Sequence, residues 1–113
     1  MDLKLSKVVS DLLSAQKDYN SHAYADCFSE TALVIDEEKE YKGKRGIKNW
    51  IEKANEQYKT AMEPIRYSGT YSTGILTALI SGDFDGSPIA LDYHMEIAGN
   101  KIVRLEITVS DEE

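Results

Sequence analysis

Hydrophobic residues recur at helical spacing in three stretches of the first half of the chain. In the first stretch they lie at i, i+3, i+4, i+7 and i+8, which gathers them on one face of a helix: Leu5, Val8, Val9, Leu12 and Leu13. Asp11 and Gln16 fall mostly on the opposite, polar side. A shorter helix is predicted over residues 21–28, with Ser21 as its N-cap. A third helix follows Gly46, where apolar residues again recur three or four positions apart: Ile47, Trp50, Ile51, Ala54 and Tyr58.

Strands are predicted between the second and third helices and throughout the second half. Residues 31–36 read as a strand because apolar side chains follow one another, and the polar residues after them form a turn into a short edge strand. From residue 63 onward the apolar period changes to two, the period of a strand in a sheet. Residues 73–80 are apolar on both faces, which favours a position inside the sheet. Helices first and antiparallel strands last predict an α+β domain with its helices on one face of a sheet.

Length, charge and cysteine content narrow the picture further. A chain of 113 residues has the size of one domain, here residues 1–113. Its net charge of −7 disfavours partners that need a basic face, such as nucleic acid and anionic membrane surfaces. The chain lacks an apolar run of the ~20 residues that would span a bilayer, and its start shows no apolar segment of a signal peptide. One cysteine, Cys27, excludes an intrachain disulfide, and a cytoplasmic location is expected.

Four segments of the chain carry a family resemblance. They are residues 24–32 (YADCFSETA), 34–37 (VIDE), 41–50 (YKGKRGIKNW) and 81–88 (SGDFDGSP). Their order and spacing resemble the nuclear transport factor 2-like superfamily, and in particular its small SnoaL-like bacterial proteins. The resemblance implies a cone-shaped (cystatin-like) fold, in which three helices from the N-terminal half pack on a curved, mostly antiparallel sheet of about six strands. It also implies a homodimer that forms through the outer face of the sheet.

Asp36 is the first candidate for chemistry. It ends an apolar strand, where a carboxylate is costly unless it is paired or hydrated. In the ketosteroid isomerase branch of the superfamily, a carboxylate at the matching position is the general base, and here Phe28 and Asp36 keep the same separation. A carboxyl group in an apolar cone can have a raised pKa and accept a proton near neutrality. The alternative is that Asp36 merely begins the polar turn with Glu37 and Glu38.

Proton transfer on a carbonyl substrate also needs donors for the developing oxyanion. The resemblance places Leu12 where the family has a donor tyrosine, and Tyr93 where it has a donor carboxylic acid. Tyr93 shares the apolar face of its strand, so it is expected to point into the cone together with Met95. Aromatic residues with polar tips are expected to line the same space and suit an amphipathic ligand: Trp50, Tyr58, Tyr67 and Tyr71. Each could equally be an ordinary core or interface aromatic.

Three functions remain open on these residues. The first is a cone that binds a small lipophilic ligand without catalysis. The second is a cofactor-independent isomerase, cyclase or dehydratase, with Asp36 as general base and Tyr93 as oxyanion donor. The third is a dimerisation module without catalysis. No cofactor or metal is expected, because one cysteine and two separated histidines supply no closely spaced ligand set and no glycine-rich phosphate loop occurs.

Overall fold

A six-stranded sheet is the scaffold of the molecule. The computed structural model describes residues 5–70 and 72–110. The strands are β1 (Phe28–Asp36), β2 (Lys39–Lys42), β3 (Ala61–Gly69), β4 (Thr73–Ser81), β5 (Ile89–Ala98) and β6 (Lys101–Val109), in the sheet order β2-β1-β6-β5-β4-β3. All neighbouring strands are antiparallel except β1 and β6, which run parallel. The parallel pair is possible because four strands and a helix separate β1 from β6 in the chain.

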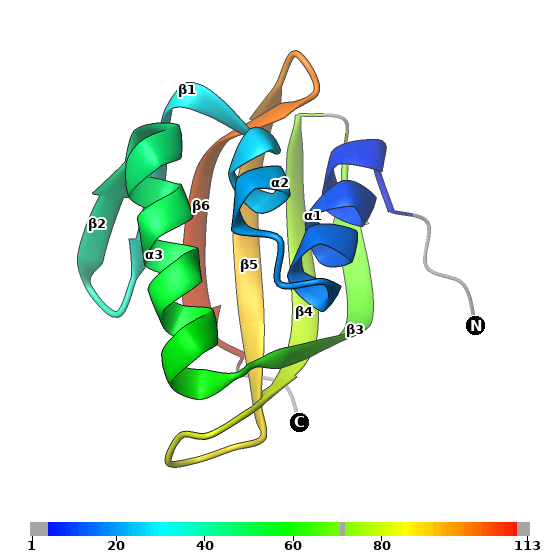
Figure 1. Cartoon of the computed structure of the whole chain (residues 1–113). Coiled ribbons are helices and arrows are strands. Elements are labelled where there is room, and N and C mark those ends of the chain that lie inside the picture. The colour runs from blue at the N-terminus through cyan, green and yellow to red at the C-terminus, as the bar shows by residue number, and fades with distance from the viewer. Residues whose placement is uncertain (1–4, 71, 111–113) are drawn as a thin grey trace.

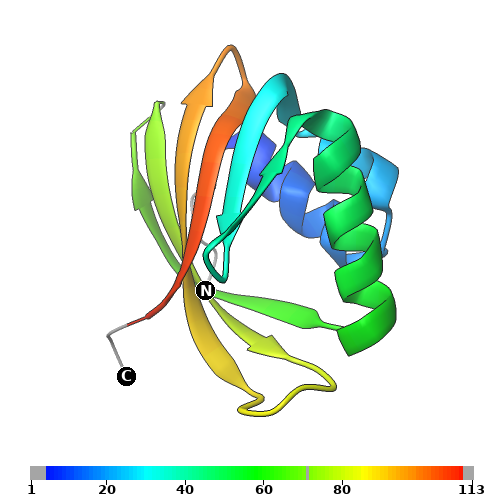
Figure 2. The same cartoon turned by 90° about the vertical axis from the view of Figure 1, so that its left-hand side faces the viewer.

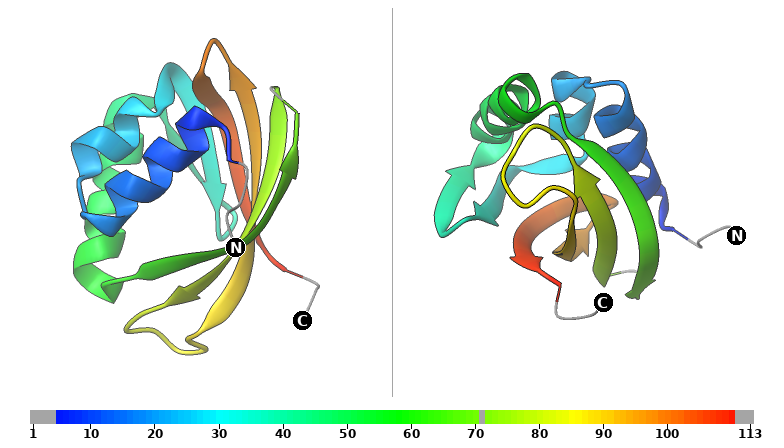
Figure 3. Two further views of the ribbon diagram at one scale, coloured as in Figure 1. Left: turned by 90° about the vertical axis from the view of Figure 1, so that its right-hand side faces the viewer. Right: turned by 90° about the horizontal axis from the view of Figure 1, so that it is seen from below.

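Three helices cover one face of this sheet. They are α1 (Lys7–Lys17), α2 (Ser21–Asp26) and α3 (Gly43–Tyr58), and Figure 1 shows them in front of the long strands. The sheet curves around them, so that its concave side faces the helices (Figure 2). The start of β3 and the β4–β5 hairpin extend beneath the C-terminal end of α3, which Figure 3 shows from two further sides. The predicted α+β cone with three helices on a curved, mostly antiparallel sheet is therefore confirmed.

The element boundaries follow local chemistry. Asn20, rather than the expected Ser21, caps α2, because its side chain accepts a hydrogen bond from the Ala23 N–H. The helix ends at Asp26, and Phe28 already belongs to β1, so the second helix is shorter than its pattern predicts. The β5–β6 hairpin turns at Gly99 and Asn100, which both have positive φ, as a two-residue turn of this kind requires.

The core lies between the helices and the concave face of the sheet. Its largest fully buried side chains come from both layers: Tyr24, Phe28, Leu12, Ile47, Leu76, Ile102, Leu105, Val9 and Val34. Alternation along β5 places Tyr93, Met95 and Ile97 on this inner face, as its period of two predicts. Among the described residues, no helix is both long and apolar enough to cross a membrane.

Candidate functional site

A cavity of about 410 Å³ lies under the helices on the concave side of the sheet. Its volume falls within the range of roughly 300–1,000 Å³ that small-molecule sites usually have. Side chains from all three helices and from five strands line it, and most of the wall is apolar: Ile51, Ala54, Met62, Ile80, Phe84, Ile89, Leu91, Ile107 and Val109. Polar groups are concentrated at a few points of this wall, which would orient a ligand that has an apolar body.

Asp36 is the half-buried carboxyl group of the wall. It is the last residue of β1, with Lys39 of β2 and Ile107 of β6 as its neighbours in the sheet register. Burial raises the pKa of Asp36 above its ordinary value, the charge of Glu37 raises it further, and a hydrogen bond from the Trp50 side chain opposes the rise. Asp36 thus begins the polar turn and also lines the cavity, so the two interpretations of this residue are compatible.

Tyr93 and Asp36 lie close enough to interact electrostatically. Tyr93 is buried on the inner face of β5, and burial followed by the charge of Asp36 raises the pKa of its phenol far above the usual range. The hydroxyl group is therefore neutral at physiological pH and can donate a hydrogen bond into the cavity. Both residues line the same space, as an acid–base group and a donor for one ligand would have to.

Tyr24 is a third polar group of this cluster, and sequence reasoning did not place it there. It comes from α2, lines the cavity, and packs edge-on against Trp50 with ring centroids 6.2 Å apart. Burial raises the pKa of Tyr24, and the charges of Tyr93, Cys27 and Asp36 contribute. The resemblance places Leu12 on the first helix where the family has a donor tyrosine, and here α2 supplies a phenol at this wall instead. No local signal distinguishes Tyr24 from a core aromatic, because its position depends on how α2 crosses the sheet.

The other expected pocket residues divide into two groups. Trp50 and Tyr58 line the cavity, each from α3. Leu12 and Met95 lie elsewhere in the hydrophobic core, where both are buried. Tyr67 also lies outside the lining, with its ring against Gly74, and its buried hydroxyl group has no hydrogen-bond partner within residues 5–70 and 72–110. Tyr71 lies outside the described residues. For the described residues of this set, the sequence pattern predicts the apolar face of the element, but the packing decides which side chains reach the cavity.

A buried amide forms a second polar point of the wall. Gln16, expected on the polar side of its helix, is only 3% exposed and lines the cavity. Its Nε2 donates to Asn55 Oδ1 at 2.9 Å and to Thr60 Oγ1 at 3.0 Å, which ties α1 to the end of α3. Gln16 Oε1 has no hydrogen-bond partner among the described residues. An unpaired buried acceptor lowers the stability of the folded state.

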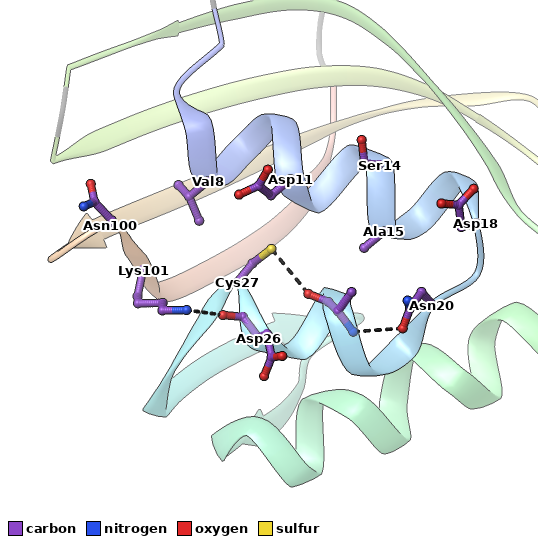
Figure 4. A pocket seen from close by; sticks show the side chains of 11 residues that line it. Val8, Asp11, Ser14, Ala15, Asp18, Asn20, Asp26, Cys27, Asn100 and Lys101 are labelled. Atoms are coloured by element: carbon purple, nitrogen blue, oxygen red, sulfur yellow. Dashed lines mark hydrogen bonds between the residues drawn. The ribbon is translucent and has the colours of Figure 1, made fainter.

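A second hollow of about 400 Å³ lies between α1, α2 and the β5–β6 turn. Figure 4 shows its wall, which includes Asp11, Asp18, Asp26 and Cys27. The Cys27 thiol donates to the Ala23 carbonyl, and Lys101 donates to the Asp26 carbonyl. Within residues 5–70 and 72–110, no group of histidine, cysteine and acidic side chains is arranged to hold a metal ion. The hollow lacks the concentrated aromatic lining of the larger cavity.

The fold is shared with several solved structures. A candidate polyketide cyclase from Sinorhizobium meliloti is 29% identical with a TM-score of 0.88, and the match covers 92% of this chain and 95% of that one. A hypothetical protein with a ketosteroid isomerase-like fold from Catenulispora acidiphila, in complex with trimethylamine, is 14% identical with a TM-score of 0.84, covering 96% and 88%. A nuclear transport factor 2-like protein of unknown function from Cytophaga hutchinsonii is 16% identical with a TM-score of 0.78, covering 97% and 95%.

These similarities were found by comparing structures, not sequences. No protein-family model matches the chain, and neither does any curated protein sequence. The structural neighbours confirm the resemblance that the four sequence segments carry. One is described as a candidate cyclase, one by its ketosteroid isomerase-like fold and one as a protein of unknown function. A shared fold identifies the architecture rather than a reaction.

Proposed function

We propose that this member of the nuclear transport factor 2-like superfamily binds a small lipophilic molecule in the cavity beneath its helices. The observation that carries the proposal is a cavity of about 410 Å³ with a mostly apolar wall and one concentrated polar cluster of Asp36, Tyr93 and Tyr24. Such a wall buries an apolar body and fixes its orientation through a few hydrogen bonds. The neighbour from Catenulispora acidiphila is described in complex with trimethylamine, so a protein of this fold occurs with a small organic molecule bound.

The fluorescence of Trp50 offers a direct test. Trp50 is the single tryptophan of the chain and lines the cavity, so a bound aromatic ketone would quench its emission. We expect 2-acetylnaphthalene to quench Trp50 saturably in the micromolar to millimolar range. Ala54→Phe, which fills the cavity from α3, should weaken this binding at least about tenfold. Ala98→Phe, the same change at an exposed position of β5, is the matched control and should bind normally. Saturable binding that Ala54→Phe leaves intact would contradict the proposal.

Proton transfer is the second candidate, and the environment of Asp36 favours it specifically. The pKa of Asp36 is raised, and two neutral phenols lie near it, so Asp36 could act as a general base and the phenols as oxyanion donors.

In this reaction Asp36 takes a proton from the carbon next to a carbonyl, the phenols donate hydrogen bonds to the enolate oxygen, and Asp36 returns a proton. Incubation of 2-acetylnaphthalene in D₂O, followed by NMR, should then show protein-dependent deuteration of its acetyl methyl group. Exchange that persists unchanged in Asp36→Asn would exclude this role.

A homodimer and a cytoplasmic location complete the proposal. Ile75 is exposed on β4, and its register neighbour on β5 is His94, so the outer face mixes apolar and polar groups. A face of this composition could pack against the same face of a second copy of the chain. The unpaired thiol of Cys27 suits a reducing compartment.

A further inference from the structure

The aromatic and charged side chains of the cavity wall indicate which charge the ligand has. Five aromatic side chains line it: Tyr24, Trp50, Tyr58, Phe84 and Tyr93. Three carboxyl groups line it as well, those of Asp36, Glu37 and Asp85. No lysine, arginine or histidine is found among the described residues of this wall. The wall therefore combines aromatic rings with negative charge and supplies no positive charge to balance it.

The three carboxyl groups of the wall lie at two different depths in the cavity. Glu37 and Asp85 are exposed, so they belong to the mouth of the cavity, whereas Asp36 is half-buried next to Trp50. Lys39 faces Asp36 across the β1–β2 ladder, but it is exposed and is not part of the wall. Carboxylates at the mouth of a cleft raise the local concentration of cations, and the net charge of −7 acts in the same direction.

The interior then offers two kinds of contact to a cation. Aromatic faces attract an organic ammonium ion through the ring quadrupole, most strongly when water is excluded, and tryptophan is the best such partner. Trp50 is held in place by edge-on packing against Tyr24 and by stacking on Tyr41, with centroids 5.5 Å apart. The nearby carboxyl group of Asp36 would neutralise the bound charge, which reduces the cost of burying it.

The same wall disfavours an anionic ligand. Such a ligand would meet three carboxyl groups, and no lysine, arginine or histidine among the described lining residues would compensate their charge. The buried Gln16 amide does not offset them, because its Nε2 donates to Asn55 and Thr60 within the protein.

We infer that the ligand of the cavity is a lipophilic organic cation, in which an ammonium group attached to an apolar body lies among the aromatic rings and Asp36. The inference rests on the proposed function, because it names the charge of a ligand for that same cavity. The apolar wall buries the body, and Asp36 with Trp50 holds the ammonium group.

A charge series on one ring system tests the inference in the unaltered protein. The probes are (naphthalen-2-ylmethyl)trimethylammonium, neutral 2-acetylnaphthalene and anionic 2-naphthoate, measured by isothermal titration calorimetry at pH 7. The quaternary cation should bind at least about tenfold more tightly than the neutral ketone, and the anion more weakly than both. If the ketone binds as tightly as the cation, the charge inference is wrong and the proposed function stands. If none of the three binds, both are wrong.

Two variants with the same change in net charge locate the effect. Asp36→Asn should reduce the preference for the cation over the ketone to within about twofold while the ketone still binds. Asp11→Asn, an exposed position on α1 outside this wall, should keep the full preference. Equal losses in the two variants would mean that only the long-range field acts, which would overturn the assignment to Asp36. The charge series is measured on the unaltered protein. It can therefore refute the inference even if one of the variants fails to fold.

Discussion

At the scale of single residues, Asp36 links the site to stability. Its pKa is raised in the native structure, chiefly by burial, from an ordinary value of 3.8 that applies to the unfolded chain. The native state therefore holds this proton more tightly than the unfolded state does. The stabilising contribution of the protonated group is fully present below the unfolded pKa and is lost as the pH rises through the native pKa. A charged Asp36 thus lowers the free energy of unfolding near neutral pH.

We predict that Asp36→Asn raises the melting temperature at pH 7 and that this gain shrinks as the pH falls towards 4. The amide keeps a hydrogen-bond acceptor for Trp50 while it removes the buried charge. Thermal unfolding of both proteins, followed by circular dichroism between pH 4 and 8, measures the difference. Asp83→Asn, at an exposed position of the β4–β5 hairpin, is the control and should show no such pH-dependent gain. A variant less stable than the parent at every pH would contradict the argument.

Cys27 is a second residue whose environment sets its chemistry. Burial, followed by the charge of Asp11, raises the pKa of its thiol from 9.0 to about 11. At pH 8 this leaves roughly a hundredfold less of the reactive thiolate than an unperturbed thiol would have. We predict that 5,5′-dithiobis(2-nitrobenzoate) reacts with the native protein at least about a hundredfold more slowly than with the urea-unfolded chain. Comparable rates in the two states would show that the side chain is accessible and unperturbed.

At the scale of elements, the end of α3 positions part of the cavity. Lys59 follows the helix in the left-handed conformation, with φ 50° and ψ 52°, and its N–H donates to the Asn55 carbonyl. This conformation is one that glycine adopts without a steric penalty. The turn brings Thr60 back to the Gln16 and Asn55 amides, so a strained lysine holds one side of the hydrogen-bonded group in the cavity wall.

We predict that Lys59→Gly raises the free energy of unfolding by about 0.5–1 kcal/mol, because it relieves the positive φ at the end of the helix. Urea unfolding followed by Trp50 fluorescence measures the change. Lys53→Gly, an exposed position inside the same helix, is the matched control and should lower stability by about 1 kcal/mol. Loss of stability in both variants would show that Lys59 carries no conformational strain.

At the scale of the whole molecule, the helices leave the outer face of the sheet uncovered (Figure 2). Ile75, 43% exposed, lies on it beside His94, and Thr77 donates a 2.6 Å hydrogen bond to Asp92 on the same face. His94 Nε2 and Thr108 Oγ1 lie 3.0 Å apart across β5 and β6. Polar pairs that satisfy one another reduce the desolvation cost of covering this face with a second copy.

We predict that the protein is a dimer at micromolar concentration and that Ile75→Glu shifts it towards the monomer. A carboxylate buried at the centre of an interface without a partner is costly. Size-exclusion chromatography with light scattering reports the mass directly. Tyr19→Glu introduces the same charge at a similarly exposed hydrophobic residue on the helical side, and it should leave the dimer intact. A monomeric parent protein would refute the expected assembly.

Periodicity along the chain determined most of the fold. The spacing of apolar residues located the three helices and the long strands, because each element buries only one face and its own geometry sets the repeat. The turn at Gly99 and Asn100 also depends on the local sequence, because both turn positions have positive φ and few residue types adopt that conformation. The family resemblance then supplied the arrangement in space, and the placement of Asp36 and Tyr93 on one cavity wall agrees with the sequence-based expectation.

Only tertiary packing decided the rest of the site. Met95 and Tyr93 share a face of β5, yet only Tyr93 reaches the cavity, because the curvature of the sheet and the position of the helices decide where a hollow remains. Tyr24 joins the wall because α2 crosses the sheet there, and Gln16 is buried because it meets Asn55 of a helix 39 positions away. A sequence pattern reports which side of an element is apolar. It does not report how closely the facing elements pack, and that spacing creates the cavity.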